Sequence, residues 1–149
     1  MTTYVFVYGT LKRGLFNYGK HLEPAIDAGK ASFVAAARTS RADFCMVLDD
    51  KGFFPCLFRA KSGGCQVSGE VFRVDADTLA ALDRLERVDD GWYRREEVAV
   101  ELLDGQQETI KANVYLAPVS DDLIKLERIS NYEPEMNAKC AIWFCENML

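Results

Sequence analysis

The sequence has a single histidine, no long hydrophobic run and no excess of basic residues, and each of these shortages excludes a class of protein. Eighteen basic residues against twenty-three acidic ones give a net charge of −5, so phosphate backbones and anionic lipid surfaces would repel the chain. The apolar runs are too short to span a bilayer, and no basic, hydrophobic leader precedes Tyr4. We therefore expect no nucleic-acid partner, no membrane partner and a cytoplasmic location.

The five cysteines do not follow the spacing of a disulfide framework or of a metal motif. Cys140 and Cys145 lie close together but have no second pair to complete a zinc site. His21 is the only histidine, so sites built on paired histidines are excluded. We expect reduced thiols and no bound metal. A thiol-dependent enzyme is an alternative, using one of the other cysteines, Cys45, Cys56 or Cys65.

The length of 149 residues, 49% of them hydrophobic, predicts one domain over residues 1–149 with a single core. Residues 4–8 are wholly apolar or aromatic and predict a strand buried on both faces. Residues 19–29 predict a short helix interrupted near Pro24. Short apolar runs predict hairpins over 44–58, turning at 49–52, and over 98–116, with another strand over 65–74.

Between these strands lies one clear helical segment. Asp75 can cap a helix over 76–86, and Gly91 ends this element. Residues 121–129 are compatible with a second helix, whereas residues 134–149 have no decisive period. The pattern predicts an α+β domain with a mostly antiparallel sheet, and a closed barrel is one way to use so many short strands.

Glu86 is out of place in the helical pattern. At about 100° per residue it falls on the apolar stripe of Leu79, Leu82 and Leu85. A carboxylate aimed at the core either pairs with a cation or has a raised pKa, and a pKa near neutrality suits a general acid or base. The structural alternative is a fraying helix end or an ion pair with a nearby arginine, Arg87, Arg94 or Arg95.

The loop after the first strand is the second candidate for chemistry. Gly9 and Gly14 bracket it, and the backbone N–H groups of such a turn can hold a carboxylate or an oxyanion. The spacing also matches the first part of a phosphate-binding loop, but Leu15 and Phe16 occupy the positions of its lysine and hydroxyl residue. We therefore exclude nucleotide binding. A purely structural turn is the alternative interpretation.

Several segments together resemble one known family. Residues 5–14, VFVYGTLKRG, resemble the signature loop of the γ-glutamylcyclotransferase-like (AIG2-like) superfamily, and are closest to its γ-glutamylamine cyclotransferase branch. Residues 67–75 resemble the family's strand that enters a helix, and residues 82–86 resemble its Leu-Asp-x-x-Glu motif. Tyr93 and Arg95 resemble a Tyr-x-Arg that begins the next strand. The resemblance covers residues 4–115.

The resemblance implies a small, mostly antiparallel β-barrel flanked by short helices, with a pocket between the loop and the glutamate. It also implies a reaction without metal or cofactor on a small γ-glutamyl substrate such as ε-(γ-glutamyl)lysine. In this reaction the α-amine attacks the γ-carbonyl, releasing 5-oxoproline and a free amine. The residues carried over are Glu86 as the proton carrier, Tyr8, Gly9, Thr10 and Leu11 as the substrate-binding loop, and Tyr93 as a candidate substrate contact.

Three questions stay open at the level of sequence. The substrate could instead be glutathione or a γ-glutamyl dipeptide, because residues 118–149 match nothing in the family and could reshape the pocket. The same divergence leaves room for a non-enzymatic module that binds a small ligand or a protein. Lys12 and Arg13 could contact the substrate carboxylate or could be solvated loop charges.

Overall fold

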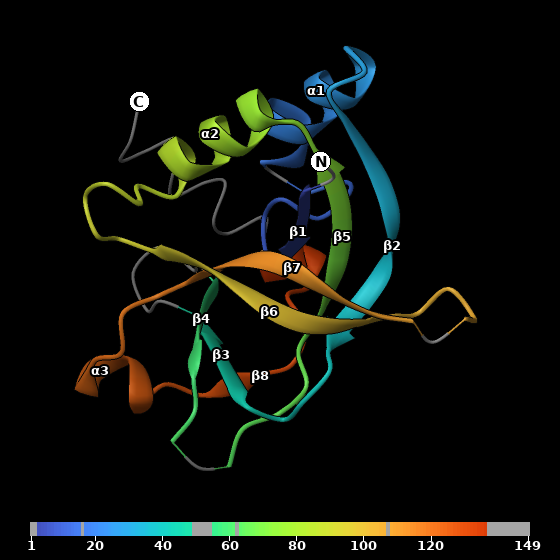
Figure 1. Ribbon diagram of the computed structural model, residues 1–149. Helices are drawn as coiled ribbons and strands as arrows, with labels where there is room; N and C mark the ends of the chain where they lie inside the picture. Colours follow the sequence, from blue (N-terminus) through green and yellow to red (C-terminus); the bar gives the residue numbers. More distant parts are fainter. Residues whose placement is uncertain (1–2, 16, 49–54, 62, 107, 137–149) are drawn as a thin grey trace.

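The computed structural model describes residues 3–15, 17–48, 55–61, 63–106 and 108–136. A closed five-stranded barrel forms its centre, with a smaller sheet beside it (Figure 1). This confirms the α+β class and the small barrel. Around the barrel the strands follow in the order β1 (Thr3–Val7), β5 (Ser68–Val74), β2 (Ala31–Thr39), β6 (Arg94–Leu102) and β7 (Thr109–Leu116).

Antiparallel pairing dominates the barrel, as predicted, and one parallel contact closes it. The only parallel pair of strands in the barrel is β1 with β7, where Val5 faces Asn113. The Asn113 side-chain amide also donates to the Tyr4 carbonyl at 3.1 Å. The barrel therefore contains both antiparallel and parallel strand pairs, and a side-chain hydrogen bond strengthens the short β1–β7 pair.

The first strand is buried on both faces, as its unbroken apolar sequence predicts. Phe6 belongs to the cluster that fills the barrel, whereas Val5 and Val7 belong to a second cluster that also contains Leu22 and Leu82 from the helical segments. All of these side chains are at most 3% exposed. The chain that leaves β1 therefore starts from a fixed position.

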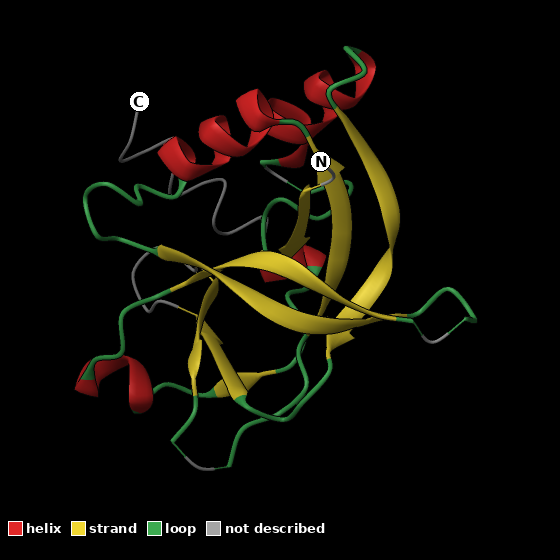
Figure 2. Ribbon diagram, viewed as in Figure 1, coloured by secondary structure: helices red, strands yellow, loops and turns green. Residues whose placement is uncertain are grey.

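The helical segments 18–27 and 76–85 lie along one side of the barrel, whereas α3 (Asp121–Ile124) lies apart from them (Figure 2). A π-helical turn, η1 (Tyr18–Leu22), leads into α1 (Glu23–Asp27). Pro24 lies in the first turn of α1, where a missing backbone N–H costs nothing. The predicted interruption near Pro24 corresponds to the change from η1 to α1 between Leu22 and Glu23.

The predicted helix after β5 is α2 (Ala76–Leu85). The Asp75 carboxylate caps it by accepting a hydrogen bond from the Thr78 N–H at 2.8 Å. The helix ends one residue earlier than predicted, so Glu86 is its C-terminal cap residue. Gly91 then adopts a left-handed conformation with φ of 78°, in the turn that returns the chain to β6.

The second sheet has the strand order β4 (Pro55–Arg59), β3 (Phe44–Leu48) and β8 (Arg128–Ile129). Its β3–β4 pair confirms the strands of the predicted 44–58 hairpin, whose 49–52 turn lies outside the described residues. The predicted helix over 121–129 is only half correct. α3 covers its first four residues, and β8 pairs with β3 because sheet hydrogen bonding overrides a weak helical pattern.

The remaining hairpin is formed by β6 and β7, with Val98 opposite Ala112 and Val100 opposite Ile110. It confirms the predicted alternation, although β6 begins four residues earlier, at Arg94. The strand predicted over 65–74 begins later, at Ser68, while Cys65 makes only an isolated bridge to Phe44. No helix in the described ranges has both the length and the apolar character needed to cross a membrane.

Candidate active site

A pocket of about 930 Å³ opens where β1 ends. Its walls come from the loop after β1, the end of α2, the start of β4 and the segment after β7. The structure brings all the candidate site residues to this one pocket, although they come from distant parts of the sequence. The residues in question are Tyr8, Gly9, Thr10, Leu11, Glu86 and Tyr93.

The loop after β1 is held in shape by its own backbone. The Lys12 N–H donates to the Gly9 carbonyl at 3.0 Å, which closes a tight turn. Asn17 then binds Thr10 twice, through its backbone N–H to the carbonyl at 2.9 Å and through its side-chain amide to the hydroxyl at 2.8 Å. Leu11 is buried beneath the loop. The sequence did not mark Asn17, which lines the pocket and supports the loop.

Three consecutive backbone N–H groups of this loop, those of Gly9, Thr10 and Leu11, have no acceptor among the described residues. Such groups in a turn attract carboxylates and oxyanions. The loop can therefore bind an anionic group through its backbone alone.

Gly9 permits the loop to lie directly against β4. A Cβ atom at this position would be 2.3 Å from Cγ of Pro55, which is closer than any van der Waals contact. Pro55 is itself buried at the start of β4, and its ring has little freedom to withdraw. The glycine is needed here for space.

Glu86 stands at the end of α2 and faces the same pocket. Its backbone N–H donates to the Leu82 carbonyl at 2.9 Å, and Leu82 is fully buried. Its carboxylate has no hydrogen bond and no ion pair with any described residue. Since no fully buried side-chain oxygen in the described residues lacks a partner, the Glu86 oxygens reach the open space of the pocket.

The arginines named in the structural alternative have other partners. The Arg87 Nε atom lies 3.9 Å from Oδ2 of Asp90, and the Arg95 Nε atom lies 2.9 Å from Oδ1 of Asp83. Arg94 pairs with Glu96. The ion-pair interpretation of Glu86 is therefore not supported by the described residues.

Burial raises the pKa of Glu86 from its ordinary value to about 7. Both protonation states are then populated near neutral pH, as a group that accepts and later donates a proton requires. Burial, and next the Glu86 charge, raise the pKa of Tyr8 well above its usual range, so this phenol stays protonated. Of these two groups, the Glu86 carboxyl is the one that titrates near pH 7.

Two tyrosines from the prediction line the pocket with their hydroxyls already bonded. The Tyr8 hydroxyl donates to the Tyr115 carbonyl at 2.6 Å. The Tyr93 hydroxyl donates to the Pro55 carbonyl at 3.0 Å. Tyr8 and Tyr93 therefore offer ring surfaces to a ligand, and Tyr93 also links the segment before β6 to β4.

A polar brace that the sequence analysis missed holds the last turn of α2 on the barrel. The Asp83 carboxylate accepts a hydrogen bond from the Tyr115 hydroxyl at 2.7 Å and forms an ion pair with the Arg95 guanidinium at 2.9 Å. Asp83 stands three residues before Glu86, so the brace fixes the turn from which Glu86 projects. One feature of the sequence could have indicated this brace. Tyr115 is an aromatic residue at a position of its strand where the alternating pattern otherwise places polar residues.

The thiols take different positions. Cys56 lines the pocket with its sulfur 3.8 Å from the Tyr93 hydroxyl, whereas Cys45 and Cys65 lie outside it. His21 does not line the pocket either, so no histidine accompanies Cys56 there. Cys140 and Cys145, the weak zinc candidates, lie outside the described residues.

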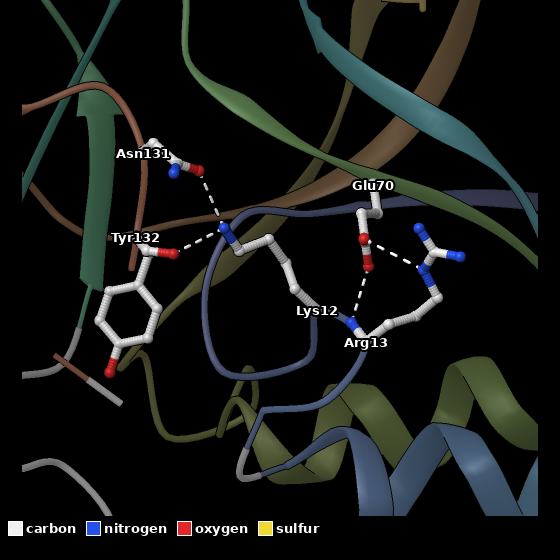
Figure 3. A network of polar contacts seen from close by, with 5 residues as sticks. All are labelled: Lys12, Arg13, Glu70, Asn131 and Tyr132. Carbon is white, nitrogen blue, oxygen red and sulfur yellow. Dashed lines mark hydrogen bonds and ion pairs between the residues drawn. The ribbon is translucent and has the colours of Figure 1, made fainter. Parts of the chain in front are cut away.

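Lys12 and Arg13 hold the loop through polar contacts with residues far away in the sequence (Figure 3). The Lys12 ammonium donates to the Asn131 side chain at 2.9 Å and to the Tyr132 carbonyl at 2.6 Å. Glu70 on β5 accepts the Arg13 backbone N–H at 2.7 Å and pairs with its guanidinium at 3.2 Å. Neither basic residue lines the pocket, so both act as supports of the loop.

We predict that Glu70→Gln weakens substrate binding more than it slows the chemical step. A glutamine keeps one acceptor but loses the charge that holds the Arg13 guanidinium, so the loop N–H groups are less well positioned. KM should rise about fivefold, equivalent to roughly 1 kcal/mol, with kcat nearly unchanged.

Steady-state kinetics measure both constants. Glu101→Gln is the matched control, because it breaks an arginine pair of 2.9 Å with Arg38 away from the pocket. Equal kinetics in Glu70→Gln and the control would contradict a positioning role for Glu70.

Comparison with known proteins assigns this chain to the cyclotransferases, a class of enzymes. The family model described as "Gamma-glutamyl cyclotransferase, AIG2-like" matches residues 5–134, and the chain belongs to this family. The resemblance in the sequence is thereby confirmed. The expectation that residues 118–149 match nothing in the family is wrong for residues 118–134, because the match extends to residue 134.

Relatives and solved structures agree with this assignment. Gamma-glutamylaminecyclotransferase A of Danio rerio is 38% identical over 117 residues, which cover 78% of this chain and 70% of that protein. Gamma-glutamylaminecyclotransferase of Homo sapiens is 37% identical over 67% of this chain and 63% of its own length. The crystal structure of an AIG2-like protein from Mus musculus has a TM-score of 0.77 and 27% identity, covering 89% of this chain and 88% of that one.

Proposed function

We propose that this chain is a γ-glutamylamine cyclotransferase, which releases 5-oxoproline and a free amine from small γ-glutamyl amines such as ε-(γ-glutamyl)lysine. One observation carries the proposal: the Glu86 carboxyl is unpaired among the described residues, has a pKa of about 7 and shares a pocket with three available loop N–H groups. The relatives named gamma-glutamylaminecyclotransferase support it.

The loop binds the glutamyl part of the substrate. The N–H groups of Gly9, Thr10 and Leu11 donate to its α-carboxylate, and the rings of Tyr8 and Tyr93 pack against its carbon chain. With the carboxylate held there, the α-ammonium approaches the Glu86 carboxylate. Binding therefore bends the γ-glutamyl chain so that its amine lies near its own γ-carbonyl carbon.

Glu86 then moves protons between the two nitrogens. As a base it removes one proton from the α-ammonium, and the amine attacks the γ-carbonyl carbon to form the new C–N bond. As an acid it protonates the leaving nitrogen, so the old C–N bond breaks. A second proton passes from the ring nitrogen to the departing amine, and the products are 5-oxoproline and an ammonium ion.

The attack is intramolecular, so the pocket contributes mainly by positioning. The pocket holds the reacting atoms close together in a bent conformer. The reaction therefore does not need a collision between two molecules, with the loss of translational and rotational entropy that such a collision costs. One desolvated carboxyl near pH 7 then suffices for proton transfer, and each step uses residues of this chain only.

The test is release of 5-oxoproline by the purified protein from ε-(γ-glutamyl)lysine, γ-glutamyl-alanine and glutathione. We expect the isopeptide to have the highest kcat/KM. Faster turnover of glutathione or the dipeptide would reassign the leaving group, and tight binding of 5-oxoproline without turnover would identify a binding module. Loss of activity in Cys56→Ser, with the fold intact, would favour a thiol-dependent enzyme.

A further inference from the structure

The pocket extends beyond the residues that bind the glutamyl part. The segment 117–126, which follows β7 and contains α3, forms a separate wall of the same pocket. Figure 1 shows the chain leaving the end of β7 and entering α3 at the edge of the molecule. This wall lies beyond residues 4–115, which the sequence resemblance covers, and the proposed reaction does not use it.

This wall combines an apolar surface with two charges. Pro118, Leu123 and Leu126 contribute the apolar part. Asp122 and Lys125 contribute opposite charges, and they are three residues apart on one helical turn, so both project from the same face.

Neither charge has a partner in the part of the chain that the structure describes. Asp122 and Lys125 are exposed, and they do not form an ion pair even with each other. Arg87 lines the pocket too, but it lies near Asp90 and over the Trp92 ring, at 4.7 Å from the ring centre. The two charges of the α3 wall are therefore available to a ligand.

We propose that the α3 wall binds the leaving amine, and that it selects an amine bearing both an ammonium and a carboxylate at the end of an aliphatic chain. This inference rests on the proposed function. Asp122 attracts the α-ammonium of a departing lysine, Lys125 attracts its α-carboxylate, and Leu123 packs against the methylene chain. The wall thus favours an isopeptide formed through the side chain of lysine.

The same charges disfavour glutathione. Its leaving group is attached through its own α-amine, so it presents a carboxylate but no free ammonium. Asp122 then gains no partner, and its charge repels the carboxylate. Asp122 is therefore the residue that distinguishes the two kinds of substrate.

Four substrates that differ only in the leaving amine test the proposal. ε-(γ-Glutamyl)lysine carries both charges, γ-glutamylcadaverine carries the ammonium alone, γ-glutamyl-6-aminohexanoate carries the carboxylate alone, and γ-glutamylpentylamine carries neither. Asp122→Asn should lower kcat/KM about threefold to fivefold for the two substrates with an ammonium. Lys125→Gln should do the same for the two with a carboxylate.

Matched controls are Asp121→Asn, a neighbouring carboxylate outside the pocket, and Lys111→Gln, an exposed lysine on β7. The effects should shrink in high salt, since both charges are exposed. Losses that are equal across the four substrates, or no losses at all, would overturn the proposed wall. A wild-type protein that releases no 5-oxoproline from any of the four would instead overturn the proposed function.

Discussion

Replacing Glu86 by glutamine should lower kcat for 5-oxoproline release by about a hundredfold or more. Glutamine has nearly the same shape but cannot accept a proton from the α-ammonium or return one to the leaving amine. Because the carboxylate is not paired with any described residue, the exchange breaks no ion pair and leaves the pocket walls in place. The quantity to measure is the single-turnover rate with saturating ε-(γ-glutamyl)lysine, which reports the chemical step.

The stability of the same variant provides an independent control. A raised pKa means that the folded protein keeps the proton of Glu86 where the unfolded chain has lost it, so native stability falls as pH rises from about 4.5 to about 7. The glutamine variant has no such loss. It should therefore be more stable than the native protein above pH 7, by at most about 3 kcal/mol, and equally stable near pH 4.

Thermal unfolding at several pH values measures this difference. Glu108→Gln removes an exposed carboxylate outside the pocket and should change neither rate nor stability. A Glu86→Gln variant with a near-native rate would remove Glu86 from the mechanism.

Replacing Gly9 by alanine is expected to have the second largest effect. The added methyl group would lie 2.3 Å from Pro55, so the loop must move away from β4. Overpacking of this kind costs about 1–3 kcal/mol in stability, and it displaces the N–H groups proposed to hold the substrate. We expect kcat/KM to fall at least about tenfold, since displacements of about 1 Å at a positioning group cost up to about a hundredfold.

Gly19→Ala is the matched control, because a Cβ atom there meets nothing within 4 Å. Steady-state kinetics and thermal unfolding of the two variants separate a local clash from a general effect of alanine. Native kinetics in Gly9→Ala would show that the contact between the loop and Pro55 does not set the geometry of the site.

The sequence predicts the barrel strands because their apolar patterns are strong. Residues 4–8 have no polar residue, and β1 is buried on both faces as a result. The last turn of α2 was harder to place. Glu86 is the C-terminal cap residue and not part of the helix, yet it still faces the apolar side because the Asp83 brace holds that turn on the barrel.

Long-range contacts explain what the sequence did not predict. Lys12 could have been a substrate ligand, and only the fold reveals that Asn131 and Tyr132, more than a hundred residues away, bind its ammonium. Tyr115 follows the polar alternation of its strand, but α2 covers that face and buries it. Such pairings depend on the closed barrel, which no local pattern specifies.

The same limit applies to the segment after β7. Residues 121–129 are compatible with a helix, but no local pattern indicates that α3 ends at Ile124 or that β8 pairs with β3. Asp122 and Lys125 become meaningful only when the fold places both on the wall of the pocket that Glu86 also lines. The proposed choice of substrate therefore depends on tertiary structure, as does the meeting of Glu86 with the loop.

The most direct test of the account is an NMR titration of the Glu86 side-chain carboxyl carbon, identified by its absence from the spectrum of the Glu86→Gln variant. The Glu86 carboxyl lies beside the loop, is desolvated and has no partner among the described residues. We therefore expect a pKa of about 7 for Glu86 in the free protein. A midpoint near 4.5, the ordinary value for an exposed glutamate, would contradict the desolvated site and the proton transfer built on it.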